Sequence, residues 1–182
     1  DEKVSKGAAR EQFSNAFQYM WVKEQATLQY VTIQQWGESV THVESQMARV
    51  GREAKLDSIY VGLGSKLTKV RLHTLLEGKG AQANPLGVFF GNHDQRFDVY
   101  TIQDHAEGET QSDLLFKAAL KDRAQSCYQG IIRIPRQAQR SNAYQANRNL
   151  LLGKDAKATT APNLEIIPDD LRCTHGATVG TI

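Results

Sequence analysis

Cysteine is scarce in this chain, with two residues among 182, Cys127 and Cys173. Two cysteines cannot build the disulfide framework of a small secreted protein, so the sequence favours a reducing compartment. A charge excess of one sign is also lacking, because 22 Lys and Arg residues nearly balance 20 Asp and Glu residues. A balanced surface gives no broad electrostatic footprint for nucleic acid, and we therefore expect no nucleic-acid partner.

Long hydrophobic runs are missing as well. No apolar stretch approaches the roughly 20 residues that span a bilayer, and no signal peptide is visible, so we expect no membrane association. The sequence starts without an initiator Met and stops at Thr181 and Ile182. We interpret it as a fragment of a longer protein, long enough for one domain with a substantial core.

Motifs of several common enzyme classes are absent from the sequence. It contains no phosphate-binding loop followed by Lys and Ser or Thr, and no Gly-x-Ser-x-Gly elbow. A β-helical glycosidase or lyase would need carboxylates that face each other across a groove. The nearest candidates for such a set are Asp94, Asp98, Asp104 and Glu107. Because they form no recognisable constellation, we predict that the chain is not an enzyme.

The sequence does contain a succession of short apolar segments separated by compact polar turns. The segments are rich in β-branched and aromatic residues and often alternate in polarity, which is typical of β-strands. They are residues 28–33 (LQYVTI), 59–63 (IYVGL), 88–90 (VFF), 97–102 (FDVYTI), 131–134 (IIRI), 163–167 (NLEII) and 171–179 (LRCTHGATV). Residues 114–120 (LLFKAAL) fit a helical turn or a strand, and we interpret them as a strand.

The turns recur at regular positions, and a small residue follows each of them. These residues are Ala26, Ala54, Ala81, Thr110, Ala124, Ala138, Ala156 and Ala177. The first four are 28, 27 and 29 residues apart, the next two steps are 14 residues each, and the last two, of 18 and 21, are looser. A unit of 14 residues that doubles to 28 predicts a solenoid coil with two strands and two turns.

We therefore predict an all-β fold, a flattened right-handed parallel β-helix whose two sheets face each other across an apolar interior. A left-handed β-helix is disfavoured because its six-residue apolar repeat is missing. A β-sandwich is the structural alternative, although its turns would recur about every 8–12 residues. Phe13, Phe17 and Met20 have helical spacing, so we expect residues 1–20 to form a short helical or irregular lead-in and residues 21–182 to form the β-helix core domain.

The last dozen residues hold the strongest chemical signal, a cysteine and a histidine two positions apart in an extended segment. Residues i and i+2 of a strand point to the same face, so Cys173 and His175 would place a thiol beside an imidazole. Gly176 beside them is a candidate bulge or turn. Both side chains can bind zinc, copper or iron, but a stable metal centre usually requires about four ligands. The pair would need ligands from elsewhere, and the alternative is a buried cysteine beside a hydrogen-bonded histidine.

The other cysteine and histidines carry weaker signals. Cys127 lies beside an apolar segment and is predicted to be a small core residue. His42, His73 and His93 occur singly and are expected to be surface or hydrogen-bonded side chains. His105 has acidic neighbours, which makes it a candidate to add to a metal environment.

Four arginines would lie along one side of a solenoid: Arg133, Arg136, Arg140 and Arg148. We expect this set to form a solvated face, with a binding surface as the alternative.

The C-terminal part of the chain resembles a known family. Residues 149–153 (NLLLG), 161–166 (APNLEI) and 169–180 (DDLRCTHGATVG) closely resemble the SufD branch of the SufB/SufD family, which belongs to the SUF iron–sulfur cluster assembly machinery. The SufB branch differs here, with a Glu-His-Glu-Ala type motif in place of Cys-Thr-His-Gly-Ala. Weaker resemblance extends back to about Ala26, through residues 31–39 and 128–131.

This resemblance implies a β-helix that acts as a scaffold for cluster assembly. It implies pairing with SufB through the β-helix, and binding of the SufC ATPase by C-terminal helices that this sequence lacks. A transient iron–sulfur cluster would form at the SufB–SufD junction, where the family's histidine corresponds to His175, with Cys173 as a secondary candidate. The family also often has a histidine at the position of His105. No cofactor is expected in the isolated fragment, and the expected location is the cytoplasm, or the plastid stroma in a photosynthetic eukaryote.

Two further expectations concern partners. The predicted sheet edge near the Cys-x-His motif is open, so we expect the fragment to pair with itself through the face meant for SufB. The alternative class of function is a β-solenoid interaction module without a metal role, in which Cys173 and His175 are packing residues.

Overall fold

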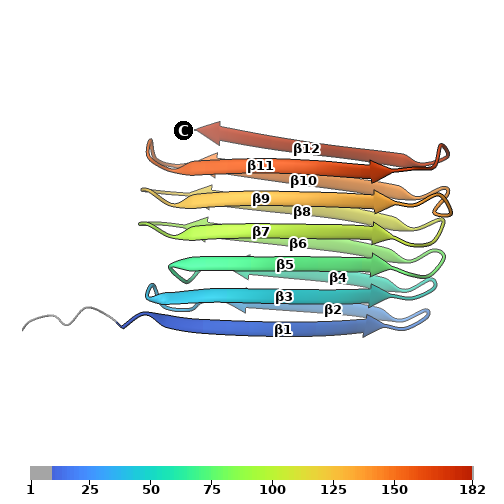
Figure 1. Cartoon of the computed structure of the whole chain (residues 1–182), viewed down its shortest axis with the longest axis horizontal. Helices are drawn as coiled ribbons and strands as arrows, with labels where there is room; N and C mark the ends of the chain where they lie inside the picture. Colours follow the sequence, from blue (N-terminus) through green and yellow to red (C-terminus); the bar gives the residue numbers. More distant parts are fainter. Residues whose placement is uncertain (1–9, 182) are drawn as a thin grey trace, which may run out of the picture.

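The chain consists of parallel strands stacked in order along one axis, as shown by a computed structural model that describes residues 10–181 (Figure 1). The strands are β1 (Gln12–Val22), β2 (Thr27–Gln34), β3 (Val40–Val50), β4 (Lys55–Gly62), β5 (Leu67–Leu76), β6 (Gln82–Gly91), β7 (Arg96–His105), β8 (Gln111–Leu120), β9 (Gln125–Ile134), β10 (Asn142–Leu151), β11 (Lys157–Ile166) and β12 (Arg172–Thr181).

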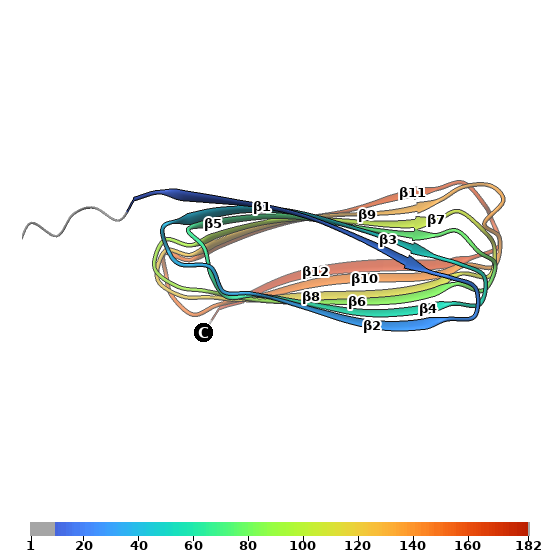
Figure 2. The same ribbon diagram turned by 90° about the horizontal axis from the view of Figure 1, so that it is seen from below.

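The strands divide into two six-stranded sheets that face each other across a flat interior (Figure 2). Sheet A has the order β1-β3-β5-β7-β9-β11, and sheet B has the order β12-β10-β8-β6-β4-β2. Because odd and even strands alternate between the sheets, each coil contributes one strand to each. Coil length varies, since 26 residues separate Thr41 from its partner Leu67 and 32 separate Gln125 from Lys157. The chain is a flattened parallel β-helix with two strands per coil, as the turn spacing predicts.

The pairing pattern rules out the alternative fold. Neighbouring strands within each sheet pair in parallel, whereas a β-sandwich is built from antiparallel strands. Residues 114–120 fall in β8, which confirms the strand interpretation. Within residues 10–181 there is no helix, and so none that is long and apolar enough to cross a membrane.

The expected lead-in is wrong where the structure describes it, because residues 12–20 belong to β1. Residues 1–9 lie outside the described part of the chain. Strand β1 pairs in register with β3 from Gln12 to Val22. Its polarity is unusual, since Phe13 and Phe17 point outward and are exposed while Met20 points inward. The helical spacing of these three residues is therefore accidental.

The small residues that mark the repeat lie at the two corners of the coil, except for Ala177, which lies within β12. Ala54, Ala81 and Ala138 are fully buried at the corner between odd and even strands, and Ala124 is fully buried at the opposite corner. This placement explains the 14-residue half-period. Ala26, in the first coil, is exposed.

Aromatic side chains stack along the middle of the interior. Tyr60, Phe89, Phe116 and Tyr128 follow one another with ring centroids 5.6, 6.0 and 5.8 Å apart, and each is almost fully buried. Gly87 makes room for this stack, since a Cβ there would lie 2.3 Å from the Phe116 ring. Aromatic pairs at such separations stabilise beyond their burial, and the contact of Phe116 with Tyr128 joins sheet B to sheet A.

Candidate functional site

Cys173 and His175 lie on the same face of β12, as their spacing predicts, and that face is the inner one. Cys173 is paired with Ala143 of β10 and His175 with Gln145, and both of these partners are fully buried. The ladder between β10 and β12 is continuous from Arg172 to Thr181, so Gly176 makes no bulge. Strand β12 is the edge of sheet B, and its open side is free of any strand of the described chain.

The two side chains differ in their surroundings. Cys173 is half-buried and packs against the apolar cluster of Ile132, Ile134, Ala138 and Ala143. This burial raises the pKa of the Cys173 thiol, so the uncharged thiol is favoured until a metal or a cation displaces its proton.

His175 is exposed, although it points toward the interior side of its strand. Among residues 10–181 its imidazole makes no hydrogen bond and no ion pair. The neighbouring inward-facing residues are also partly uncovered, because Leu164, Ile166 and Val179 are exposed large apolar side chains. The thiol and the imidazole therefore lie at an accessible, largely apolar mouth of the interior.

A layer of buried polar groups lies directly beneath this mouth. Gln145 is fully buried, and neither its Oε1 nor its Nε2 has a hydrogen-bond partner among the described residues. The Oγ1 of Thr160 on β11 is likewise buried without a partner. Unpaired buried groups of this kind are uncommon and call for a specific reason.

The donor set fits a metal or a sulfide-containing group only in part. Thiol and imidazole are suitable ligands for iron, but they are two, where a cluster usually takes about four. Within residues 10–181, no three His, Cys, Asp or Glu side chains come close enough together to hold a metal ion. The pair can therefore complete a site only with ligands from another chain or from solvent.

His105 does not join this pair. It is fully buried in β7, where Nδ1 lies 2.8 Å from Thr110 Oγ1 and Nε2 lies 2.9 Å from Ser112 Oγ. Burial lowers the pKa of His105 to about 4, so the imidazole is neutral at physiological pH. With both ring nitrogens in hydrogen bonds, His105 is a structural residue of the interior.

Cys127 is not the core residue that the sequence suggests. It faces outward from β9, between the buried Ser126 and Tyr128, and lines an outer cleft of about 630 Å³ on sheet A. Lys69 and Arg71 line the same cleft, and the Arg71 guanidinium lies 5.8 Å from the centre of the Tyr100 ring. The prediction was based on the apolar residues 131–134 that follow, but Cys127 lies on the face of β9 opposite to the inward-facing Ile132 and Ile134.

The four arginines do not share one side of the solenoid. Arg133 projects from the outer face of sheet A and pairs with Glu165 at 3.0 Å, whereas Arg148 projects from sheet B. Arg136 and Arg140 lie in the corner between β9 and β10, where Arg140 pairs with Glu109. The acidic candidates are separated too, since Asp94 pairs with Arg123 and Asp98 with Arg96.

A buried network around His42 is missing from the sequence-based predictions. The Nε2 of His42 lies 3.0 Å from Glu44 Oε2, and its Nδ1 lies 3.0 Å from Ser14 Oγ. Gln46 Nε2 donates to Glu44 Oε1 at 2.8 Å. His42, Glu44 and Gln46 occupy every second position of β3, in the same inward-facing series as the buried Val40, Ala48 and Val50. A period of two counted from these apolar positions is the signal that could have placed the three polar residues inside.

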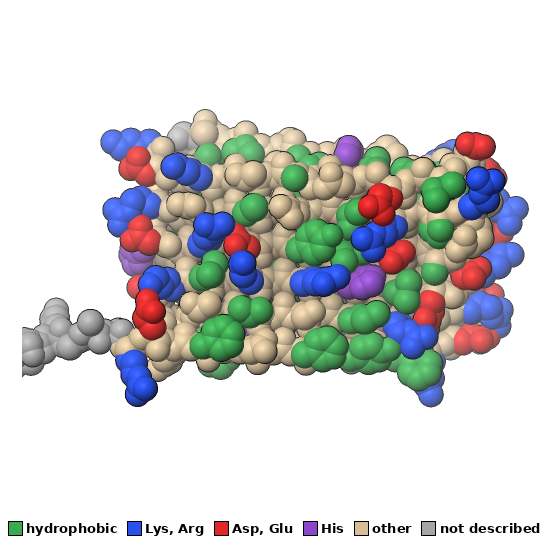
Figure 3. All heavy atoms as spheres, viewed as in Figure 1, with side chains coloured by type: hydrophobic (Ala, Val, Ile, Leu, Met, Phe, Trp, Pro, Cys, Tyr) green, Lys and Arg blue, Asp and Glu red, His purple; other side chains and the backbone are tan. Residues whose placement is uncertain are grey.

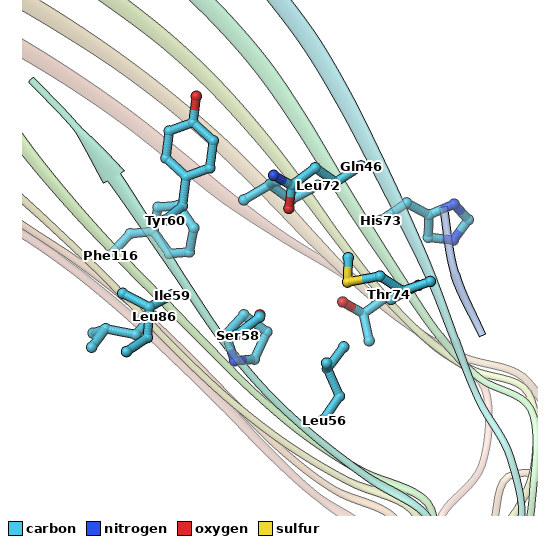
Figure 4. A pocket seen from close by; sticks show the side chains of 13 residues that line it. Gln46, Leu56, Ser58, Ile59, Tyr60, Leu72, His73, Thr74, Leu86 and Phe116 are labelled. Carbon is cyan, nitrogen blue, oxygen red and sulfur yellow. The ribbon is translucent and has the colours of Figure 1, made fainter. Parts of the chain in front are cut away.

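A small, partly open cavity adjoins this network (Figure 4). Its volume is about 20 Å³, and Gln46, Ser58 and Thr74 provide polar groups on its wall. That volume suits one water molecule, which needs two to four polar partners. The cavity therefore has room for one water molecule and none for a substrate.

These features define a class of protein. The chain is a β-solenoid whose edge strand presents a thiol and an imidazole side by side at an accessible mouth, and its interior is otherwise filled with side chains. Such a site can share a metal with another chain but cannot enclose one alone.

The chain belongs to the SufBD family of iron–sulfur cluster assembly proteins. Residues 2–182 match the family model described as SUF system FeS cluster assembly, SufBD core domain. The match agrees with the resemblance of residues 149–180 to this family.

Individual relatives support this placement. An iron–sulfur cluster assembly SufBD family protein of Mycobacterium leprae is 30% identical over 157 residues, which cover 82% of this chain and 40% of the relative. The iron–sulfur cluster assembly protein SufD of Escherichia coli is 32% identical over 120 residues, 66% of this chain and 28% of the relative. SufD of Plasmodium falciparum is 28% identical over 170 residues, 92% of this chain and 12% of the relative. The chain thus spans less than half the length of each of these relatives.

Proposed function

We propose that this chain is the β-helix part of a SufD-like scaffold, which pairs with SufB and holds a nascent iron–sulfur cluster at their junction. The cluster is cargo in this proposal, so the chain keeps no resident cofactor. His175 supplies a ligand to it and Cys173 is the secondary candidate. The chain itself performs no catalysis, and ATP hydrolysis belongs to SufC, which contacts a part of the longer protein outside residues 1–182. The proposed location is the cytoplasm, or the plastid stroma in a photosynthetic eukaryote.

The observation that carries the proposal is the exposed His175 imidazole beside a half-buried thiol on the inner side of an edge strand. His175 makes no hydrogen bond within residues 10–181, so its ring nitrogens are available to a group on a partner. Two ligands leave a cluster incompletely held, which suits a scaffold that must hand its cargo to an acceptor. Apolar neighbours around the mouth lower the local dielectric and strengthen metal–ligand contacts once a partner covers them.

The test is to co-express the full-length protein with SufB and SufC and to measure iron and acid-labile sulfide in the purified complex. We expect His175→Ala to lose most of both and Cys173→Ala to lose less, while the three proteins still co-purify. His93→Ala is the matched control, because His93 is an exposed histidine in a distant corner that contacts Glu38. Iron and sulfide at wild-type levels in His175→Ala would reject the proposed role.

A second candidate function is a β-solenoid interaction module without a metal role. It is favoured by a row of outward-facing aromatic side chains on β1, where Phe13 and Phe17 are each 69% exposed and Trp21 is 56% exposed. Figure 3 shows apolar side chains gathered over this edge of the molecule. Exposed apolar patches commonly mark protein contacts. This function predicts that Phe17→Ser weakens complex formation while His175→Ala leaves both assembly and metal content unchanged.

A further inference from the structure

The amide of Gln145 is unpaired in the interior beneath β12. Gln145 projects inward from β10 with no exposed surface, and both of its side-chain polar atoms lack partners among residues 10–181. An unsatisfied buried polar group destabilises a fold, so an apolar residue would be more stable in this place unless the amide has another use.

The opposite sheet is shaped to accept this amide. A Cβ built on Gly130 of β9 would lie 2.4 Å from Gln145 Nε2 and 2.6 Å from the Tyr128 hydroxyl oxygen. Any side chain at position 130 would therefore displace the amide, and glycine leaves the space that it fills. Gln145 thus spans the interior from sheet B to the backbone of sheet A, which restricts its rotamers.

The next residue along the ladder is His175. Gln145 and His175 are register partners on the inner faces of β10 and β12, and such partners lie about 4.8 Å apart between backbones. The imidazole is exposed and has no hydrogen bond of its own within the described chain. The imidazole N–H of His175, which lacks an acceptor, and the Oε1 of Gln145, which lacks a donor, therefore belong to adjacent residues of one ladder.

We propose that Gln145 is a positioning residue for His175, whose ring Nδ1–H donates a hydrogen bond to the Gln145 Oε1. This inference rests on the proposed function, since it concerns the same imidazole. A histidine that binds metal usually donates its other ring N–H to a fixed acceptor, which selects the tautomer and the ring orientation. With Nδ1–H bonded to Gln145, Nε2 carries the free lone pair and faces the mouth beside Cys173.

The test reads the tautomer of His175 directly, without metal and without partner proteins. Nitrogen-15 NMR of histidine-labelled chain, at a pH where the imidazole is neutral, distinguishes the Nδ1–H form from the Nε2–H form that free imidazole side chains prefer. The His175→Ala spectrum assigns the signal among the five histidines. We expect mainly the Nδ1–H form in the wild type, and a wild-type spectrum dominated by Nε2–H overturns the proposal.

Four variants separate positioning from simple packing. Gln145→Met keeps length and volume but removes the acceptor, so His175 should revert to the Nε2–H form, whereas Gln145→Glu keeps an acceptor and should retain Nδ1–H. Gly130→Ala should act like Gln145→Met because it displaces the amide. Asn149→Leu is the matched control. Asn149 also faces inward from β10 and has an unpartnered Oδ1, but its register partner is Val179.

The variants also separate this inference from the proposed function. If Gln145→Met and Asn149→Leu leave the same His175 spectrum as the wild type, Gln145 does not position the imidazole, whatever the metal content of the complex. If Gln145→Met switches the tautomer while His175→Ala retains iron and sulfide in the complex, the positioning stands and the cluster role fails. Where both hold, Gln145→Met should lower the iron content of the complex roughly 10-fold or more, the usual effect of losing an outer hydrogen-bond partner.

Discussion

The hydroxyl of Tyr60 donates a 3.0 Å hydrogen bond to Glu44 Oε2, which joins β4 of sheet B to β3 of sheet A across the interior. Burial, followed by the negative charge of Glu44, raises the pKa of Tyr60 well above its ordinary value, so the hydroxyl remains a donor. His42 and Gln46 supply the other contacts to the same carboxylate. A buried carboxylate is tolerated only when it is bonded in this way.

Removing the Tyr60 hydroxyl should therefore destabilise the chain more than removing a comparable neutral hydroxyl. We expect Tyr60→Phe to lower the free energy of unfolding by about 2 kcal/mol, because hydrogen bonds to charged groups contribute about 1.5–3 kcal/mol. Tyr128→Phe is the matched control, since its hydroxyl bonds to the neutral Thr101 at 2.8 Å, and it should cost about 1 kcal/mol. Urea unfolding followed by circular dichroism measures both, and equal losses would contradict a charged acceptor.

Acid should destabilise the fold through His105. Its folded pKa is about 4, below the ordinary value of 6.5, so between these values the unfolded chain binds a proton that the folded chain does not. Stability is therefore fully present above about pH 6.5 and falls as the pH drops toward 4, by about 2 kcal/mol at pH 5. His105→Gln should remove this part of the pH dependence. Urea unfolding at pH 8 and pH 5 gives the comparison, and parallel losses in both proteins would refute it.

One corner of the coil requires a left-handed backbone conformation. Gly80 has φ +73° at the residue before the buried Ala81, and Glu53 and Glu109 adopt φ values of 52° and 59° in adjacent coils. Gly80→Ala meets no close atoms, since the nearest is Glu53 Cγ at 3.5 Å, so the change isolates backbone strain. We expect a loss of about 1 kcal/mol. Thermal unfolding of both variants measures the difference. Gly37→Ala, with nothing within 4 Å of the new Cβ, should leave the free energy of unfolding unchanged or slightly raised.

The turn spacing predicts the solenoid because small residues recur at the corners of most coils. Ala54, Ala81 and Ala124 have no exposed surface, and a larger side chain would not fit where the backbones of successive turns approach. The distance in sequence between these alanines therefore gives the length of a coil, and it can be measured without a structure. The same holds for Cys173 and His175, whose common face follows from strand periodicity.

What could not be predicted depends on side chains that break the usual rule of apolar inside and polar outside. The buried inner face of β3 carries the polar residues His42, Glu44 and Gln46, whereas the outer face of β1 exposes the apolar Phe13 and Phe17. Polarity alone assigns such residues to the wrong face. The buried polar side chains of β3 are stabilised by hydrogen bonds, some of them to residues distant in the sequence such as Ser14 and Tyr60. Gln145 belongs to the same class, since only the register with β12 places it beside His175.

The open edge of β12 leads to the last prediction, that the chain associates with itself. Arg172 donates its backbone N–H to Ser141 of the neighbouring coil, so alternate residues of this parallel strand, including Ala177, direct their N–H groups away from β10. An unpaired strand edge is a template for another strand. Light scattering over a concentration series should therefore show a dimer that forms as concentration rises. Ala177→Pro removes an edge donor without removing a ladder bond, so it should weaken dimerisation at an unchanged unfolding midpoint.

Thr178→Pro provides the internal control for this reading of the edge. By the same alternation, the Thr178 N–H points toward β10, so proline there removes a ladder bond and should lower stability by about 1 kcal/mol or more. A wild-type chain that stays strictly monomeric at high concentration would show that the edge is not used for self-pairing. Loss of stability in Ala177→Pro that equals the loss in Thr178→Pro would show that the edge amides are assigned to the wrong side. If dimers form and only Ala177→Pro dissociates them without unfolding the chain, pairing occurs through β12, the strand that carries Cys173 and His175. Dimerisation would then cover the mouth and compete with any other partner that binds there.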